Sequence, residues 1–400
     1  MSPPNLTSPA FDLASACRPN ILRLKPYRCA RDDYKTGVLL DANENAYGPS
    51  LGAGVDGLTP ELLGGLNRYP DPHQIELKQE ICALRNETAA LPPLTPANLY
   101  VGVGSDECVD TALRCFAKPG FNKLLTCPPT YGMYAVAADV NDVEVVAVPL
   151  DTARPGFPLR VDAILDALTA DPSISLVYIC SPGNPTAATI DPEDVKRVLA
   201  HPTWNGIVAV DEAYIDFSPA GSSMAQYVNV YDNLIVMQTL SKAFGMAGIR
   251  LGVTYAAPAV ATIFNAVKAP YNISSMTAEL AKQAVTGAGL ATMRKHRDLI
   301  VAQRDRLIAE LPTIPGIGKD IGGHDANFLL YQILDRAGQP SNTVAEALYT
   351  RLAETKGVVV RFRGKEYGCL GALRITVGTA DENDVLVAKL RETLAEINAE

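Results

Sequence analysis

Between Leu176 and Gln238 the sequence contains three short apolar runs: Leu-Val-Tyr-Ile-Cys at 176–180, Ile-Val-Ala-Val at 207–210 and Leu-Ile-Val-Met-Gln at 234–238. A helical pattern at 193–200 separates the first two runs. Short runs without polar alternation are typical of strands buried on both faces, as in parallel sheets covered by helices. This stretch therefore predicts an α/β fold.

The same alternation of strand and helix extends outward on both sides. Further strands are expected near 100–101 and at 123–127, 143–148 and 252–255, and further helices at 105–118, where Ser105 would be the N-cap, 131–139 and 161–169. The seven strands predict a mostly parallel seven-stranded sheet between helices, in a large domain of residues 66–280. Helical periodicity over 282–311 and 344–356, strands at 327–333, 358–362 and 372–377, and a last helix from Glu382 predict a smaller α+β domain formed by residues 1–65 and 281–400.

The composition restricts the classes of partner. The chain has 400 residues and a formal net charge of -9, from 35 Lys and Arg against 44 Asp and Glu. Nucleic acid and anionic membrane surfaces select basic faces, so we expect neither as a partner. No apolar run approaches the ~18 to 20 residues that a membrane helix requires. An anionic small ligand would need positive charge concentrated at its site.

Cysteine and histidine usage favours a cytoplasmic protein without a metal. The eight cysteines are scattered and none form a Cys-x-x-Cys pair, which is typical of free thiols in a reducing compartment. Residues 1–10 contain three prolines and no apolar core, so we expect no secretory signal. The four histidines are dispersed and do not indicate a metal site.

Four motifs follow expected strands, at the sheet edge where doubly wound folds bind ligands. The first is Gly-Val-Gly-Ser-Asp-Glu at 102–107. Its glycines allow close approach of the backbone, and the helix that follows presents free N–H groups to a phosphate. The same motif is typical of a tight turn, and a nicotinamide site would need a third glycine that is absent. The second motif is Ser-Pro-Gly-Asn-Pro-Thr at 181–186, in which Asn184 offers an amide at a strand end.

The third and fourth motifs add charge. Asp211, in Val-Asp-Glu-Ala-Tyr at 210–214, ends an apolar strand, where a carboxylate is poorly solvated unless a cation meets it; a helix cap is the alternative. Lys242, in Thr-Leu-Ser-Lys-Ala-Phe-Gly at 239–245, has small and apolar neighbours, and desolvation makes a lysine amine nucleophilic. A surface lysine is the alternative. Together, an anion cradle, Asp211, Asn184 and Lys242 are the parts that a pyridoxal phosphate site requires.

With these residues in view, the chain resembles the fold-type I pyridoxal phosphate-dependent aminotransferases, and within them most closely the histidinol-phosphate aminotransferases. The resemblance extends from about Lys25 to about Leu390. Its segments, in chain order, are Leu-Asp-Ala-Asn-Glu-Asn at 40–45, Asn-Arg-Tyr-Pro at 67–70, Gly-Ser-Asp-Glu at 104–107, Cys-Pro-Pro-Thr-Tyr-Gly-Met-Tyr at 127–134, Asp-Glu-Ala-Tyr-Ile at 211–215, 239–245, Ala-Pro-Tyr at 269–271 and Leu-Arg-Ile-Thr-Val-Gly-Thr at 373–379.

The resemblance implies roles around the cofactor, pyridoxal 5′-phosphate. Lys242 resembles the Schiff-base lysine, which also acts as general base, and Asp211 resembles the partner of the pyridine nitrogen. Asn184 and Tyr214 resemble the donors to the phenolic oxygen, and Tyr131 resembles the aromatic residue stacked on the ring. The residues that correspond to the phosphate cradle are Ser105, Asp106, Thr239, Ser241 and Arg250.

The resemblance also implies how substrates and a second subunit are bound. Arg374 resembles the clamp for the substrate α-carboxylate, and would meet the phosphate of histidinol phosphate, which has no α-carboxylate. The other expected substrate-binding residues are Arg361 and Tyr27 for the phosphate, with Arg363 as an alternative to Arg361, and Asn43. Tyr69 resembles a tyrosine that reaches the partner's cofactor, which implies a homodimer.

The implied activity is a ping-pong transfer of the amino group of L-histidinol phosphate to 2-oxoglutarate, which gives imidazole-acetol phosphate and L-glutamate in histidine biosynthesis. An aromatic amino-acid aminotransferase and a phospho-amino-acid decarboxylase are alternatives of the same fold. A non-catalytic regulatory module that binds the cofactor is a remoter alternative, which the intact set of Lys242, Asp211 and Arg374 disfavours.

Two features depart from the pattern or have no assigned role. Ala187 stands where the family often has glycine after Asn-Pro-Thr; because the position needs a small residue, we expect little effect. The Pro-rich run at 91–96 has no assigned role. An acidic chain can still bind anionic ligands if its positive charge is concentrated at the site. The cations expected there are Lys242, Arg250, Arg361 and Arg374, and helix N-termini add to their positive charge.

Overall fold

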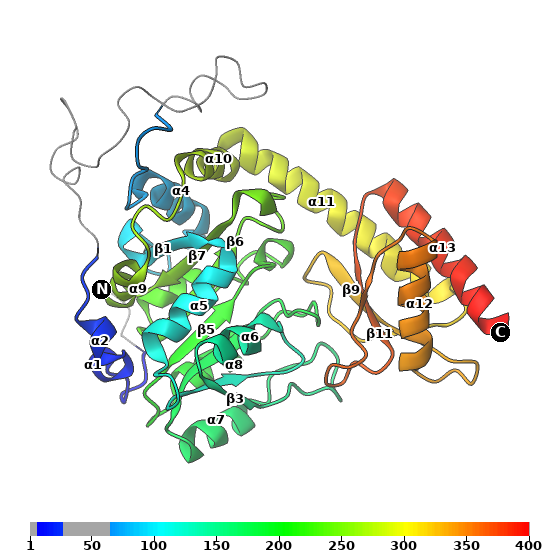
Figure 1. The fold of residues 1–400 in the computed structure, drawn as a ribbon, viewed down its shortest axis with the longest axis horizontal. Helices are drawn as coiled ribbons and strands as arrows, with labels where there is room; N and C mark the ends of the chain where they lie inside the picture. Colours follow the sequence, from blue (N-terminus) through cyan, green and yellow to red (C-terminus); the bar gives the residue numbers. More distant parts are fainter. Residues whose placement is uncertain (1–5, 27–64, 400) are drawn as a thin grey trace.

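The computed structural model describes residues 6–26 and 65–399, which form two sheets with helices packed against them (Figure 1). The larger sheet has seven strands in the order β1-β7-β6-β5-β4-β2-β3. They are β1 (Leu99–Val103), β2 (Lys123–Thr126), β3 (Glu144–Ala147), β4 (Ile174–Cys180), β5 (Ile207–Asp211), β6 (Leu234–Thr239) and β7 (Leu251–Ala256). Within the described sheet, β7 runs opposite to the other six strands, so the predicted mostly parallel sheet is confirmed.

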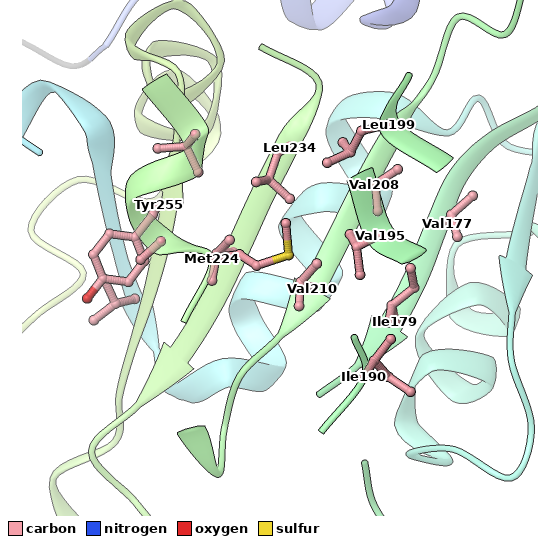
Figure 2. Close-up of a cluster of buried hydrophobic side chains, with 14 of the residues drawn as sticks. Val177, Ile179, Ile190, Val195, Leu199, Val208, Val210, Met224, Leu234 and Tyr255 are labelled. Atoms are coloured by element: carbon pink, nitrogen blue, oxygen red, sulfur yellow. The ribbon is translucent and has the colours of Figure 1, made fainter. Parts of the chain in front are cut away.

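The strands of this sheet bury alternate residues against two helical layers, as the pleat requires. Along β5, Val208 and Val210 belong to one core cluster, whereas Ile207 and Ala209 belong to the other. The first cluster includes residues of α4 (Ile75–Arg85), α7 (Val161–Ala170), α8 (Pro192–Leu199) and α10 (Ser275–Val285). The second includes residues of α5 (Gly104–Phe116), α6 (Met133–Val140) and α9 (Pro258–Val267). Figure 2 shows the first cluster, with Val208 and Val210 close to α8.

Helix α5 begins one residue earlier than expected, and Ser105 is not its N-cap. The N-cap is Val103, which forms no side-chain cap hydrogen bond. Instead, the carboxylate of Glu107 accepts a hydrogen bond from the backbone N–H of Val103. Gly104 has φ +78°, a backbone conformation that favours glycine, and it turns the chain from β1 into the helix. The predicted cap is therefore wrong because a first-turn carboxylate binds the terminal N–H group.

The smaller sheet is antiparallel, in the order β10-β11-β9-β8. It forms a core cluster of its own with its helices, whereas its residues Leu330 and Ala372 belong to the first core cluster of the large sheet. Its strands are β8 (Ile317–Asp320), β9 (Phe328–Ile333), β10 (Arg361–Phe362) and β11 (Ala372–Thr376), and its helices are α12 (Asn342–Thr355) and α13 (Ala380–Ala399). The long α11 (Gly287–Glu310) runs from the large sheet to this one (Figure 1). The helix expected over 282–311 is thus divided at Thr286, and the strand expected at 358–362 is only two residues long.

The first described residues pack against the large sheet. Helices α1 (Leu13–Ala16) and α2 (Pro19–Leu22) flank Cys17, which is buried in the same core cluster as α5 and α9. The backbone N–H of Arg18 donates a hydrogen bond of 3.0 Å to the carbonyl of Cys115. Residues 6–26, which the sequence assigns to the smaller domain, therefore contact the larger one, and the domain boundaries stay a prediction. In 6–26 and 65–399, no helix is both long enough and apolar enough to cross a membrane.

Side-chain amides hold the Pro-rich run between α4 and β1 in place. Asn86 accepts a hydrogen bond of 2.7 Å from the backbone of Leu94 and donates one of 3.2 Å to its carbonyl. Asn229 donates to the carbonyls of Pro92 and Pro93 at 3.3 and 3.1 Å. The run then enters a 3-10 helix, η2 (Pro96–Asn98). The other short 3-10 helices are η3 (Ile215–Phe217), η4 (Ala225–Asn229), η5 (Ala247–Ile249) and η6 (Leu311–Thr313).

Candidate active site

The polar residues singled out from the sequence lie at the carboxyl edge of the large sheet. Asp211 is the last residue of β5, Thr239 is the last residue of β6, and Asn184 lies in the loop after β4. These three strands are neighbours and run parallel, so their ends meet at one edge. Lys242 follows β6, and its Nζ lies 5.6 Å from the centre of the Tyr214 ring. The topology therefore brings together the residues that the motifs predicted.

Asp211 is a buried carboxylate, with 6% of its surface exposed. The hydroxyl of Tyr134 donates a hydrogen bond of 2.7 Å to Asp211 Oδ2, and the backbone N–H of Ala213 donates one of 3.1 Å to Oδ1. Burial raises the pKa of Asp211, and these hydrogen bonds offset part of the rise. Among the described residues Asp211 forms no ion pair. The site thus presents a desolvated negative charge that a cationic ligand group would stabilise.

Lys242 is exposed at the mouth of the site, yet the protein around it lowers its pKa. Partial desolvation is the main cause, and the positive charge of Arg374 adds to it, while Asp211 acts in the opposite direction. A lowered pKa enlarges the neutral fraction of the amine, which is the form that attacks carbonyl carbon. Lys242 is therefore both accessible and activated.

The loop before α5 and the start of β7 form a cradle with no room for side chains. A Cβ on Gly104 would lie 2.5 Å from Nη2 of Arg250, and one on Gly252 would lie 2.4 Å from the backbone of Gly104. The backbone N–H of Gly104 donates a hydrogen bond of 3.1 Å to the carbonyl of Arg250. Arg250 itself is half-exposed, and its Nη2 lies 3.9 Å from Oδ2 of Asp106. A helix N-terminus and a guanidinium thus lie side by side, an arrangement suited to a phosphate.

Hydroxyl groups complete this cradle. Thr239 Oγ1 lies 2.9 Å from Ser241 Oγ and accepts a hydrogen bond of 3.2 Å from the backbone N–H of Ser241. On the opposite side the hydroxyl of Tyr131 donates a hydrogen bond of 3.1 Å to Asp106. Ser105 is partly buried at the first turn of α5. All five residues predicted to hold a phosphate therefore lie around this helix terminus, in the first turn of α5, at the end of β6 or in the segment between β6 and β7: Ser105, Asp106, Thr239, Ser241 and Arg250.

The smaller sheet contributes Arg374, on β11, to the same site. Its Nη1 donates a hydrogen bond of 2.6 Å to Oδ1 of Asn184, and its guanidinium lies 5.2 Å from the centre of the Phe328 ring. Phe328 in turn packs edge-on against Tyr214, with ring centres 5.1 Å apart. Among the described residues, Arg374 Nε is buried without a hydrogen-bond partner. The predicted clamp is thus positioned beside the predicted cofactor residues with one donor unused.

The arginines at 361 and 363 differ in their surroundings. Arg361 is exposed and pairs with Arg374 across β10 and β11, so that both side chains project from one face of the sheet. Arg363 forms an ion pair of 2.8 Å with Glu366. No hydrogen bond or ion pair to the Arg361 side chain is formed by the described residues. The charge of Arg363 is thus paired and that of Arg361 is not paired within the described chain, although both act on Arg374.

The remaining predicted residues lie apart or outside the described chain. Tyr69 is 53% exposed, and its ring stacks on Tyr271 with centres 4.6 Å apart. Tyr27 and Asn43 lie outside the described residues. Two contributors were missed: Tyr134, which binds Asp211, and Phe328. Tyr134 lies in the quoted segment at 127–134, so its position in the motif was a usable signal, whereas no sequence signal pointed to Phe328.

The chain is similar to known aminotransferases over nearly its whole length. A family model for aminotransferase class I and II matches residues 35–390. The histidinol-phosphate aminotransferase of Schizosaccharomyces pombe is 54% identical over 96% of this chain and 98% of that protein. The corresponding enzymes of Candida maltosa and Saccharomyces cerevisiae are 49% and 48% identical, over 97% and 96% of this chain and 100% and 98% of theirs.

Solved structures show the same fold at lower identity. The histidinol-phosphate aminotransferase of Sinorhizobium meliloti, in complex with pyridoxal-5′-phosphate, has a TM-score of 0.72 and 23% identity, and the match covers 89% of this chain and 90% of that one. L-threonine-O-3-phosphate decarboxylase of Porphyromonas gingivalis has a TM-score of 0.64 and 18% identity, over 83% and 94%. The site geometry, the family model and the nearly full-length curated relatives agree, and the chain belongs to the class I and II aminotransferases and, within them, to the histidinol-phosphate aminotransferase family.

Proposed function

We propose that the chain is a pyridoxal phosphate-dependent transaminase that moves the amino group of L-histidinol phosphate to 2-oxoglutarate, which gives imidazole-acetol phosphate and L-glutamate. The names of the curated relatives support this substrate pair. The observation that carries the proposal is the juxtaposition of a buried carboxylate, Asp211, with an activated amine, Lys242, beside an anion cradle.

The residues present fit the cofactor. Asp211 is desolvated and forms no ion pair among the described residues, so a protonated pyridine nitrogen would supply the missing positive charge. The cradle at Gly104 and Gly252 has no space for a Cβ, which leaves backbone N–H groups and Arg250 to hold a phosphate. When bound, pyridoxal phosphate supplies an electron sink for the carbon that loses its proton.

The protein residues then divide the work of binding and proton transfer. Lys242 holds the cofactor by its amine and, once released, removes the proton from the substrate Cα. Asp211, oriented by Tyr134, holds the proton at the pyridine nitrogen. Asn184 accepts a hydrogen bond from Arg374 at its Oδ1, so its amide N–H groups are available for the cofactor's phenolic oxygen, together with the Tyr214 hydroxyl.

Arginines orient the two substrates. Arg374 presents a planar fork to the α-carboxylate of glutamate, or to the phosphate of histidinol phosphate. Arg361 projects from the same face of the small sheet and binds the phosphate of histidinol phosphate. We further propose a cytoplasmic homodimer in which Tyr69 reaches the partner's cofactor; its exposure supports this role. Light scattering should report twice the 42.7 kDa mass of the chain.

A substrate panel tests the proposed function. Transfer of the amino group from histidinol phosphate to 2-oxoglutarate should exceed transfer from phenylalanine, and no CO2 should be released. A preference for phenylalanine would make the chain an aromatic aminotransferase, and CO2 release would make it a decarboxylase. If the protein binds the cofactor but transfers no amino group in a single turnover, it is a non-catalytic module.

A further inference from the structure

A buried network of polar side chains lies on the face of the large sheet opposite Asp211. Because strand residues alternate between faces, Glu212 projects away from the Asp211 side, toward the cluster shown in Figure 2, in which Met224 and Tyr255 are labelled. Glu212 and Gln238 are 1% and 4% exposed. The network joins α4, β6 and β7 to the loop that follows β5.

Gln238 is at the centre of this network. Its Oε1 accepts hydrogen bonds from Arg85 Nε at 2.7 Å and from the Tyr255 hydroxyl at 3.1 Å. Its Nε2 donates to Glu212 Oε2 at 2.7 Å and lies 3.3 Å from Ser223 Oγ. The amide thus links four other side chains, and each of its polar atoms has a partner.

Glu212 receives three hydrogen bonds, and no cation of residues 6–26 and 65–399 forms an ion pair with it. Besides Gln238, the Ser223 hydroxyl donates to its Oε2 at 2.7 Å, and the backbone N–H of Met224 donates to Oε1 at 2.6 Å. Burial raises its pKa to about 7, and these donors offset part of the rise. The nearest positive charge in the network, on Arg85, is itself paired with Asp216 at 2.8 Å. Such a network is costly to disrupt, because each member depends on the others.

The two central residues flank the proposed cofactor contacts in the sequence. Glu212 follows Asp211 at the end of β5, and Gln238 precedes Thr239 at the end of β6. The backbone N–H of Glu212 donates to the carbonyl of Met237 at 2.7 Å. The side-chain bond between Glu212 and Gln238 reinforces this junction of the two strands.

We propose that Glu212 and Gln238 are positioning residues: their hydrogen bond fixes the distance between Asp211, which holds the pyridine nitrogen, and Thr239, which holds the phosphate. This inference rests on the proposed function, because it assumes that a single cofactor spans these two strand ends. Neither residue touches the cofactor; both act through their neighbours in the chain.

The first test is Glu212→Gln. The substitution replaces one acceptor oxygen by a donor NH2 group, although three donors face the side chain at this position. We expect affinity for pyridoxal phosphate to fall about tenfold, as for the loss of a buried hydrogen-bond partner. The pH midpoint of the visible absorbance of the cofactor-loaded protein should also shift, because Asp211 is displaced. Ser223→Ala, which removes one donor to Glu212, should shift both quantities in the same direction by less, and serves if Glu212→Gln does not fold.

The reciprocal exchange, Glu212→Gln with Gln238→Glu, should restore both quantities. In the exchanged pair, a carboxylate at 238 accepts from Arg85 and Tyr255, and an amide at 212 donates to it and accepts from Met224. The bonds from Arg85, Tyr255 and Met224 keep their direction, whereas the bond between 212 and 238 is reversed, and the Ser223 hydroxyl can accept from the new amide because a hydroxyl both donates and accepts. A rescue of this kind separates positioning from a requirement for a charge at 212.

The matched control lies at the other end of the same strand. Asn233 is fully buried, precedes β6, and donates a hydrogen bond of 3.1 Å to the carbonyl of Leu199. Asn233→Ala should lower the melting temperature and leave cofactor affinity and the absorbance midpoint unchanged. If Glu212→Gln behaves like Asn233→Ala, or if the exchange does not restore affinity, the inference is overturned. Failure of the proposed function would instead appear in the unsubstituted protein, as absence of cofactor binding or of amino-group transfer.

Discussion

Arg374 Nη1 donates a hydrogen bond of 2.6 Å to Asn184 Oδ1, although the two residues are 190 positions apart. The bond connects β11 of the small sheet to the loop after β4 of the large sheet. It orients both partners: the Asn184 amide nitrogen is left to face a ligand, and the guanidinium is held at the same edge. The proposed substrate clamp and the proposed cofactor-binding amide are therefore parts of one hydrogen-bonded unit.

Substitution of Arg374 and substitution of Arg361 should change the KM values of the two substrates differently. Arg374→Ala should raise KM for both glutamate and histidinol phosphate, by about a hundredfold if a bidentate charged contact is lost. Arg361→Ala should raise KM for histidinol phosphate far more than KM for glutamate, because only the former carries a phosphate. Steady-state kinetics with each substrate varied in turn measures both effects. Equal effects of Arg361→Ala on the two substrates would refute its assignment to the phosphate.

Asp211→Asn should uncouple stability from activity. Asn keeps one acceptor oxygen, for the N–H of Ala213, and its amide can donate to the Tyr134 hydroxyl. Because the desolvated charge is removed, the cofactor-free protein should melt at the same or a higher temperature. Turnover should fall at least about a hundredfold, because the proton at the pyridine nitrogen loses its counter-charge. Calorimetry and single-turnover kinetics measure the two quantities. Turnover near that of the unsubstituted protein would exclude the proposed role.

The cradle makes a steric prediction. Gly104→Ala would place a Cβ 2.5 Å from Arg250 Nη2 in a backbone of φ +78°, so affinity for pyridoxal phosphate should fall at least about tenfold. Gly338→Ala is the matched control, since it has a similar φ of +74° with nothing within 4 Å of the added Cβ. Both variants carry the same kind of backbone strain. Comparable cofactor affinity in the two would show that the cradle does not hold the phosphate.

The rate at which cofactor-free protein captures pyridoxal phosphate should depend on the protonation of Lys242. Only the neutral amine reacts, so the rate should rise with pH to a midpoint below that of an ordinary lysine, because the pKa of Lys242 is lowered. Arg374→Ala removes a positive charge that contributes to this lowering. The midpoint should therefore move to higher pH in the variant, as followed by absorbance after mixing. An unchanged midpoint would contradict the coupling.

Much of the site could be predicted because parallel strands end at one edge. The apolar runs at 176–180, 207–210 and 234–238 indicated adjacent buried strands, so Asn184, Asp211 and Lys242 were expected together. Contacts such as Tyr134 to Asp211 and Arg374 to Asn184 were not predictable, since they depend on how distant elements pack.

Local backbone geometry also could not be predicted from the sequence. The small size of Ala187 predicts little effect, but its φ is +54°, a left-handed conformation that disfavours residues with a Cβ. This conformation occurs in a buried loop. The N–H of Ala187 donates to the carbonyl of Gly183, and the carbonyl of Ala187 accepts from the backbone N–H of Asp325. Ser105 shows the same limit, because the helix begins at Gly104 and the first-turn carboxylate of Glu107 binds the N–H of the N-cap Val103.

The attachment point of the cofactor tests the central claim most directly. Borohydride reduction of the pyridoxal phosphate-loaded protein, followed by peptide mapping, should place the cofactor on Lys242, and Lys242→Ala should lose the visible absorbance. Lys78 is the alternative attachment point within the chain, because burial also lowers its pKa, to about 7. Cofactor found on Lys78 or any other lysine would contradict the account.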